Sequence, residues 1–243
     1  MRTIIVVLYL VIFGVFSLFA LPFLWLVGRF NEGLKQRISQ SIVKSAFGKI
    51  LFISGIKKNV IGLERVPRDE SVLFIFNHRG FFDIILAYYT VPVLASFVSK
   101  KEIAKVPGLR VWMRNIKCVF LDRENPREGI KAILKGIENI QRGTSMFISP
   151  EGTRNSAEGL LPFKPGSLKM AEKAGCPIVP VAITNSDKVF ENHLPWIKSN
   201  RMTIEYGEPI YIHELSKESR AELLELSREE VLKLYEKNAQ LAL

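Results

Sequence analysis

The stretch Val72-Leu73-Phe74-Ile75-Phe76-Asn77-His78-Arg79-Gly80-Phe81-Phe82-Asp83 decides the fold. Its first five residues are an uninterrupted apolar run of the length expected for a strand that is buried on both faces. A short polar loop follows, and the next apolar stretch has helical length. A buried strand that passes through a polar loop into a helix is the repeating unit of an α/β fold.

The same alternation continues along the rest of the chain. Short apolar runs bounded by Pro, Gly, Asn and Asp predict seven strands, over residues 60–64, 72–76, 94–99, 118–121, 145–148, 178–183 and 202–206. Helices are predicted over residues 126–141, where Asn125 and Pro126 form a typical helix start, and over 166–174 and 217–238. We therefore expect an α/β domain over residues 59–243, built on a mixed, mostly parallel sheet flanked by helices.

Residues 1–58 differ from this domain. From Ile4 to Val27 there is no charged residue, and as a helix this run would be about 36 Å long, against about 30 Å for the hydrocarbon core of a membrane. We expect it to contact lipid and to be retained rather than cleaved, because its basic start is short and the small-residue rule fails before Ala20. Pro22 disfavours helix at the residue before it. The run is therefore either a full span or two pieces that stay in one leaflet.

A second helix is predicted directly after this run. Apolar residues recur at helical spacing from Leu34 to Leu51, and seven basic side chains surround them: Arg29, Lys35, Arg37, Lys44, Lys49, Lys57 and Lys58. This combination is typical of a helix in an anionic headgroup layer, so residues 1–58 are predicted to bind the lipid bilayer. A helix packed on the protein's own core has the same periodicity, and that alternative stays open. The basic flank predicts the cytoplasmic face of the cell membrane.

Charge and composition exclude several classes of function. The chain has 34 Lys and Arg against 24 Asp and Glu, but most of the excess lies in residues 1–58, so we expect no nucleic-acid partner. Two cysteines, Cys118 and Cys176, are too few for a disulfide framework or a Cys-based zinc site. The three histidines have no paired spacing, so no metal or other cofactor is expected. No Gly-x-Ser-x-Gly elbow of a serine hydrolase and no glycine-rich nucleotide signature occurs.

His78 and Asp83 are the candidate catalytic pair. The predicted strand delivers His78 into a loop, and Asp83 can lie at the start of the following helix, where its carboxylate would fix the tautomer of the imidazole. The free ring nitrogen can then act as a general base. Because the pair has no serine, the substrate must supply the nucleophile, most simply a hydroxyl. The alternative is a structural histidine beside a helix-capping aspartate.

Other predicted strands also end in polar loops. Strand 145–148 leads into Glu151-Gly152-Thr153-Arg154, where glycine lets the backbone approach a ligand and the forked donors of arginine suit a phosphate. Glu151 can orient the arginine or bind a substrate hydroxyl. Strand ends of an α/β sheet converge on one crevice, which adds further candidate cations. These are Lys100, Lys101, Lys105, Arg123 and the lysine of the turn 163–166, Lys164.

At these residues the chain resembles the glycerolipid acyltransferases, most closely the bacterial 1-acylglycerol-3-phosphate acyltransferases. The resemblance rests on four ordered blocks. They are the His-x4-Asp motif from His78 to Asp83, then residues 119–123, the Pro-Glu-Gly-Thr-Arg block at 150–154, and residues 177–181. The departures from the family pattern, at Lys117, Ser149, Asn155 and Cys176, leave the proposed base and its aspartate unchanged.

The resemblance implies an activity and roles for the site residues. His78, oriented by Asp83, would deprotonate the free hydroxyl of lysophosphatidic acid, which attacks an acyl thioester and gives phosphatidic acid without an acyl-enzyme. The residues that would bind the glycerol phosphate are Arg123, Glu151, Gly152, Thr153 and Arg154. The donor is a thioester of either acyl carrier protein or coenzyme A. Another lysophospholipid or glycerol 3-phosphate as acceptor, and a non-catalytic module that binds anionic lipids, remain alternatives.

Overall fold

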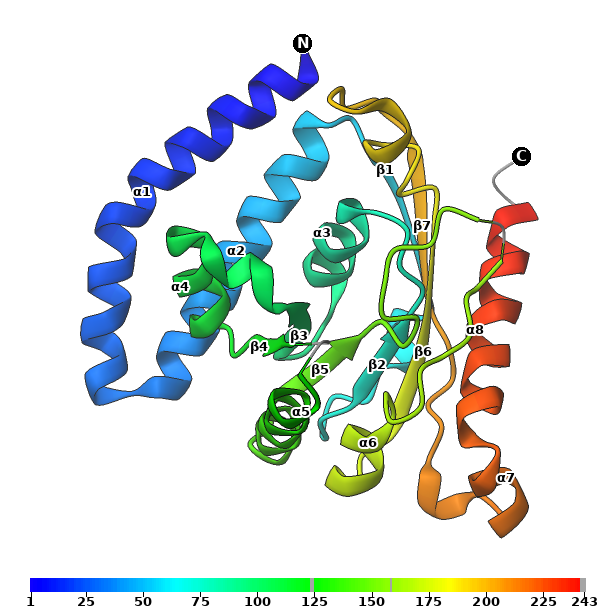
Figure 1. The fold of residues 1–243 in the computed structure, drawn as a ribbon. Coiled ribbons are helices and arrows are strands. Elements are labelled where there is room, and N and C mark those ends of the chain that lie inside the picture. Colours follow the sequence, from blue (N-terminus) through cyan, green and yellow to red (C-terminus); the bar gives the residue numbers. More distant parts are fainter. Residues whose placement is uncertain (123–124, 158, 241–243) are drawn as a thin grey trace.

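The sheet has seven strands in the order β1-β7-β6-β2-β5-β3-β4 (Figure 1). The computed structural model describes residues 1–122, 125–157 and 159–240. The strands are β1 (Lys57–Ile61), β2 (Leu73–Phe76), β3 (Ala95–Lys100), β4 (Val119–Leu121), β5 (Ser145–Ile148), β6 (Ile178–Thr184) and β7 (Arg201–Tyr206). The α-helices are α1 (Arg2–Phe30), α2 (Glu32–Ile53), α3 (Phe81–Thr90), α4 (Pro107–Asn115), α5 (Pro126–Gln141), α6 (Lys169–Ala174), α7 (Lys217–Ala221) and α8 (Leu223–Gln240). Short 3₁₀ turns are η1 (Leu63–Arg65), η2 (Lys101–Lys105), η3 (Glu191–His193) and η4 (Ile212–Glu214).

Most strand pairs are parallel, as predicted. Strand β2 pairs in parallel with β5 and β6, and β3 pairs in parallel with β5 and β4. Strand β7 is antiparallel to β6, and β1 is parallel to β7. The carboxyl ends of β2, β3, β4, β5 and β6 therefore meet at one edge of the sheet, which is where the loops with the candidate residues begin.

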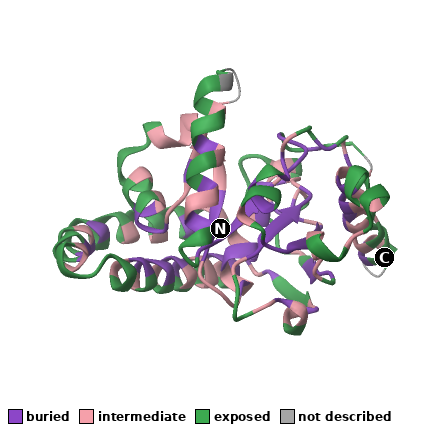
Figure 2. Ribbon diagram, turned by 90° about the horizontal axis from the view of Figure 1, so that it is seen from below, coloured by how far each residue is buried: buried purple, intermediate pink, exposed green. Residues whose placement is uncertain are grey.

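Helices cover both faces of this sheet. Side chains alternate along β2, so Phe74 and Phe76 join the apolar core beneath α2 and α3, whereas Leu73 and Ile75 join the core beneath α5, α6 and α8. All four residues are buried, as an apolar run in a central strand requires. Figure 2 shows the same layering, with buried residues along the central strands and exposed residues on the outer sides of the helices.

Three predicted boundaries need correction. Strand β1 covers 57–61 instead of 60–64, because this edge strand begins with the exposed residues Lys57 and Lys58, which give no apolar signal. Helix α6 starts at Lys169, since Gly166 has a φ of 85°. The helix predicted over 217–238 is divided at Glu222 into α7 and α8.

The sequence leaves two arrangements open for the run that contains Pro22, and the structure shows one continuous helix, because α1 continues through the proline to Phe30. One proline removes a single amide donor, and the buried side chains of Ala20 and Leu24 on either side of it keep this part of α1 packed on the molecule. The chain reverses at Asn31, whose side-chain oxygen accepts from the Leu34 amide at 2.9 Å and so begins α2. Helix α1 is long and apolar enough to cross a membrane, and most of its apolar surface is exposed.

Helix α2 packs on the protein, which was the alternative for its apolar stripe. Val43, Ile50 and Leu51 lie in the core shared with α3. Two glutamines add buried hydrogen bonds: Gln36 donates to the Thr144 hydroxyl at 2.8 Å, and Gln40 contacts the start of β3. The basic residues of the stripe's outer side, such as Arg37 and Lys49, remain exposed. The proposed boundary at residue 58 stays a prediction.

Candidate active site

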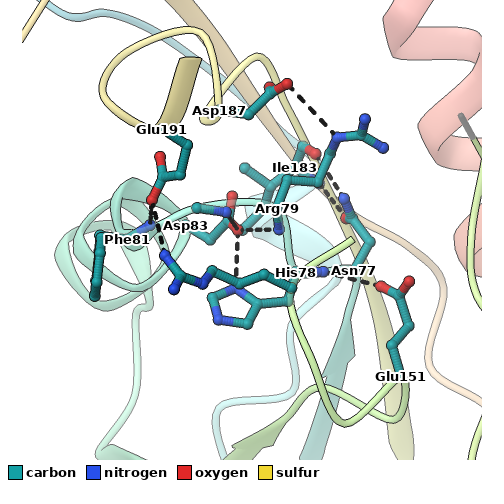
Figure 3. Close-up of polar contacts among 11 residues, drawn as sticks. Asn77, His78, Arg79, Phe81, Asp83, Glu151, Ile183, Asp187 and Glu191 are labelled. Atoms are coloured by element: carbon teal, nitrogen blue, oxygen red, sulfur yellow. Dashed lines mark hydrogen bonds and ion pairs between the residues drawn. The ribbon is translucent and has the colours of Figure 1, made fainter. Parts of the chain in front are cut away.

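His78 lies in the loop between β2 and α3, and its ring contacts Asp83 (Figure 3). The distance between His78 Nδ1 and Asp83 Oδ2 is 3.0 Å. The same carboxylate oxygen accepts from the backbone amides of Arg79 and Gly80, each at 2.7 Å. Because a carboxylate only accepts hydrogen bonds, the neutral imidazole carries its proton on Nδ1, which leaves Nε2 as the basic atom.

Burial differs sharply between the two members of this pair. The Asp83 side chain is fully buried, whereas the His78 side chain is 21% exposed. The aspartate is therefore held among fixed donors while the imidazole keeps access to a substrate. This is the geometry that a general base with an orienting carboxylate needs, and the local sequence pattern predicted it.

Buried hydrogen bonds hold the loop that carries His78. The Asn77 side chain bridges to the backbone of β6, accepting from the Ile183 amide at 2.7 Å and donating to its carbonyl at 2.8 Å. The Asn155 amide donates to the His78 carbonyl at 2.7 Å. These contacts tie the loop of His78 to the ends of β5 and β6.

Glu151 also supports this loop, through both of its oxygens. Oε1 accepts from the His78 amide at 3.0 Å, and Oε2 accepts from the Leu161 amide at 2.9 Å. Burial raises the pKa of its carboxyl, and the hydrogen bonds to these two amides oppose that effect. Glu151 thus contacts backbone rather than Arg154, and its expected role toward substrate remains a prediction.

Arg154 lies against the first residue of α3, Phe81, on the exposed side of the site. Its guanidinium lies 4.6 Å from the centre of the Phe81 ring, and Nη1 is 3.4 Å from Glu191 Oε1. Thr153 is exposed beside it. Gly152 has a φ of 72°, and the Lys164 side chain lies so close that an added Cβ would be 2.6 Å from Lys164 Cε. The left-handed conformation favours glycine here, and the end of the flexible Lys164 side chain lies over the space that a Cβ would fill.

The remaining candidate cations lie along the same sheet edge. Lys100 ends β3 and lies 3.6 Å from Glu102, while Lys105 is exposed at the end of η2. In the described ranges, no hydrogen bond or ion pair joins either lysine to the loop of His78. Lys101 pairs with Asp122 at 2.7 Å. Arg123 lies outside the described residues.

Two acidic residues near the pair are not predicted from the sequence. Glu191 accepts from the Phe81 amide at 2.7 Å, and Asp187 lies 4.0 Å from the Arg79 guanidinium. Both acids lie after β6 and belong to no motif, so only the folded chain brings them to the start of α3 (Figure 3). Among the side chains that the structure describes, no group of three or more His, Cys, Asp and Glu could hold a metal ion. The expectation of a metal-free site stays a prediction.

This arrangement suits acyl transfer to a hydroxyl. A base with an open nitrogen lies at a sheet edge where several cations gather, and an apolar helix of membrane-spanning length belongs to the same molecule. A substrate that combines an anionic head with an apolar chain matches both features.

Comparisons with known proteins agree with this chemistry. A family model described as acyltransferase matches residues 57–184. Relatives named 1-acyl-sn-glycerol-3-phosphate acyltransferase include those of Borreliella burgdorferi, 28% identical over 82% of this chain and 80% of the relative, and of Saccharomyces cerevisiae, 28% identical over 96% and 76%. The protein of that name from Salmonella typhimurium is 30% identical over 73% of this chain and 72% of its own.

A solved structure shows the same fold. The crystal structure of the 1-acyl-sn-glycerophosphate (LPA) acyltransferase PlsC from Thermotoga maritima superimposes with a TM-score of 0.78 over 97% of both chains, at 23% identity. The family match covers more than half of the chain and includes both members of the His78–Asp83 pair. The chain therefore belongs to the acyltransferase family.

Proposed function

We propose that this protein transfers a fatty acyl group from an acyl thioester to the free hydroxyl of lysophosphatidic acid, which gives phosphatidic acid for phospholipid synthesis. The observation that carries the proposal is the His78–Asp83 contact, with Nδ1 fixed at 3.0 Å from the carboxylate and Nε2 left free. The names of the relatives supply the acceptor, because they are 1-acyl-sn-glycerol-3-phosphate acyltransferases.

The reaction follows from these atoms. His78 Nε2 takes the proton of the acceptor hydroxyl as its oxygen attacks the thioester carbonyl carbon. The tetrahedral intermediate collapses, the carbon–sulfur bond breaks, and the departing thiolate takes the proton from the imidazolium. Asp83 holds the ring in place and stabilises its transient positive charge. No acyl-enzyme forms, because the substrate supplies the nucleophile.

Cations at the sheet edge would bind the phosphate of the acceptor. Arg154 is the leading group, since its guanidinium is close to the catalytic loop and offers forked donors. Thr153, Lys100, Lys105 and Arg123 complete the proposed set. The acyl donor is a thioester of acyl carrier protein or of coenzyme A, and both are anionic partners that this basic edge would attract.

The membrane is the expected location of the reaction. The exposed apolar surface of α1 requires lipid around it, and both lysophosphatidic acid and its product are held in a bilayer. The basic residues that follow α1 support a position of this surface at the cytoplasmic face, by the positive-inside rule. This position would bring the site to the leaflet that contains its acceptor.

One assay tests the acceptor and the donor together. The purified full-length protein is incubated in detergent micelles with lysophosphatidic acid and either acyl-coenzyme A or acyl-carrier protein, and phosphatidic acid is measured by mass spectrometry. We expect product from at least one donor, and none above background with His78→Ala. Parallel reactions with glycerol 3-phosphate and with other lysophospholipids test the alternative acceptors. Binding to anionic vesicles without turnover for any acceptor would instead identify a lipid-binding module.

A further inference from the structure

Glu191 lies outside the matched family range, in η3, but its side chain reaches back to the catalytic loop. Figure 3 shows its carboxylate at the start of α3, beside Phe81 and next to the turn that carries His78 and Asp83. The side chain is 15% exposed and packs directly on Gly80, where an added Cβ would overlap its carboxylate. The carboxylate is therefore in close contact with the backbone of the catalytic loop.

One oxygen of Glu191 makes two contacts. Oε1 accepts from the Phe81 amide at 2.7 Å, and the same oxygen is 3.4 Å from Arg154 Nη1. The two amides that precede Phe81 in the chain, those of Arg79 and Gly80, are bound by Asp83. Three consecutive backbone donors are thus engaged by two carboxylates, which links Glu191 to the turn that orients the base.

Arg154 is held on two sides. The Phe81 ring lies under its guanidinium at 4.6 Å, and the Glu191 carboxylate lies beside Nη1. Its side chain is 46% exposed, so its other donors remain open to solvent. Without the carboxylate, this long side chain would keep only its contact with the ring and would sample more rotamers.

We propose that Glu191 is a positioning residue that holds Arg154 beside the catalytic loop, so that the guanidinium is ready for the phosphate of the acceptor. The inference rests on the proposed function. The competing role is structural, in which Glu191 only satisfies the Phe81 amide at the start of α3.

The variant Glu191→Gln separates the two roles. Its amide oxygen can still accept from the Phe81 amide, but the charge that attracts Arg154 is lost. We expect the KM for lysophosphatidic acid to rise about two- to fivefold, the range set by the strength of a partly exposed ion pair, with kcat and the KM for the donor unchanged. The matched control is Glu208→Gln, which also removes a carboxylate that is paired with an arginine. Glu208 lies 3.0 Å from Arg65 and follows the end of β7, far from the strand ends that carry the candidate site.

A double-mutant cycle with Arg154→Ala tests whether Glu191 acts through Arg154. Positioning predicts that Glu191→Gln has no further effect on the acceptor KM once Arg154 is absent. It also predicts no effect on a phosphate-free acceptor such as monoacylglycerol.

Several outcomes would overturn the inference. They are an unchanged acceptor KM in Glu191→Gln, an effect that persists in the Arg154→Ala background, or a variant that no longer folds, since only the cap role assigns so much stability to this side chain. If the wild-type protein makes no phosphatidic acid, the proposed function fails instead.

Discussion

Three donors converge on a single oxygen of Asp83: one imidazole nitrogen and the amides of Arg79 and Gly80. The other oxygen, Oδ1, is buried and makes no hydrogen bond in the described part of the chain. A buried oxygen without a partner is costly, so this carboxylate is placed for the orientation of His78 rather than for stability alone.

The variant Asp83→Asn tests this orientation. An asparagine oxygen can still accept from the two amides, but it carries no charge to stabilise the imidazolium, and its NH2 group favours the wrong tautomer when it faces the ring. We expect kcat to fall by roughly 10⁴-fold, as in other histidine–carboxylate pairs, with a far-ultraviolet spectrum like that of the wild type. A rate within a few-fold of the wild type would reduce Asp83 to a helix cap.

Lys164 is a second residue whose surroundings suggest a role. Arg79 and Arg154 face carboxylates, whereas the Lys164 ammonium makes no ion pair or hydrogen bond within the described ranges. Its stem lies across Gly152, beside the loop that supports His78. An unneutralised cation in this position is suited to a phosphate.

We predict that Lys164→Met raises the KM for lysophosphatidic acid about tenfold, the loss expected for one charge-assisted hydrogen bond. Methionine keeps the apolar stem over Gly152 and removes only the charge. Lys169→Met, five residues further along on an exposed helix position, is the matched control and should behave as the wild type. The KM for lysophosphatidic acid is measured for both variants by steady-state kinetics. An equal KM in the two would exclude a phosphate role for Lys164.

At the scale of elements, the apolar pattern predicted the sheet well. Strand β2 carries its signal within its own sequence, because it is buried on both faces and needs an apolar side chain at every position. Strand β1 is an exposed edge strand held by backbone pairing with β7, so its boundary could not be read from side chains. The sequence leaves the continuity of α1 through Pro22 undecided for a similar reason, since packing on distant residues outweighs a local preference.

In the candidate site, too, some neighbours follow from the local sequence and others only from the folded chain. His78 and Asp83 are five residues apart, and a strand, loop and helix pattern places them together. Glu191 meets Phe81 across 110 residues, and only the order of β2 and β6 in the sheet brings the two together. Neighbours of this kind follow from the whole topology, which a local motif does not contain.

The role of α2 gives a prediction at this scale. Gln40 is buried, donates to the Val93 carbonyl at 2.7 Å and accepts from the Ala95 amide at 3.0 Å. Gln40→Leu would leave both backbone groups buried without partners. We expect it to lower the free energy of unfolding by roughly 2–5 kcal/mol, measured by urea denaturation in detergent. The control is Gln141→Leu, at an exposed position at the end of α5, which should lower the free energy of unfolding only slightly. Equal stability of the two variants would contradict a core role for α2.

For the whole molecule, α1 is the part that faces away from the domain. It is attached at several points: the Trp112 indole donates to the Ser17 hydroxyl at 2.9 Å, the Phe13 and Trp112 rings lie 5.4 Å apart, and the Ile197 amide donates to the Thr3 hydroxyl at 2.8 Å. Its other side exposes a row of large apolar side chains. A truncation that starts at Asn31 therefore removes the exposed helix α1 and keeps α2, whose apolar side chains lie in the core.

We predict that a chain starting at Asn31 folds but acts poorly on membranes. Its rate on lysophosphatidic acid in vesicles should fall roughly 10- to 100-fold, because enzyme and acceptor no longer share one surface. The rate on a short-chain, water-soluble acceptor should stay near that of the full chain. Vesicle flotation and thermal unfolding check that binding is lost and the fold retained. A full rate on vesicles would show that α1 is dispensable for catalysis.

The position of β1 has a consequence for biosynthesis. This strand lies at the edge of the sheet and its neighbour there is β7, with Lys57 opposite Arg201, so its partner is made long after β1 itself. At about 5–20 residues per second, β7 is synthesised roughly 7 to 30 s after β1. By then α1 has left the ribosome, so this long apolar helix is free to contact a bilayer before the sheet is complete. Until β7 is made, β1 has no partner, and its exposed lysines, Lys57 and Lys58, would discourage pairing with other nascent chains.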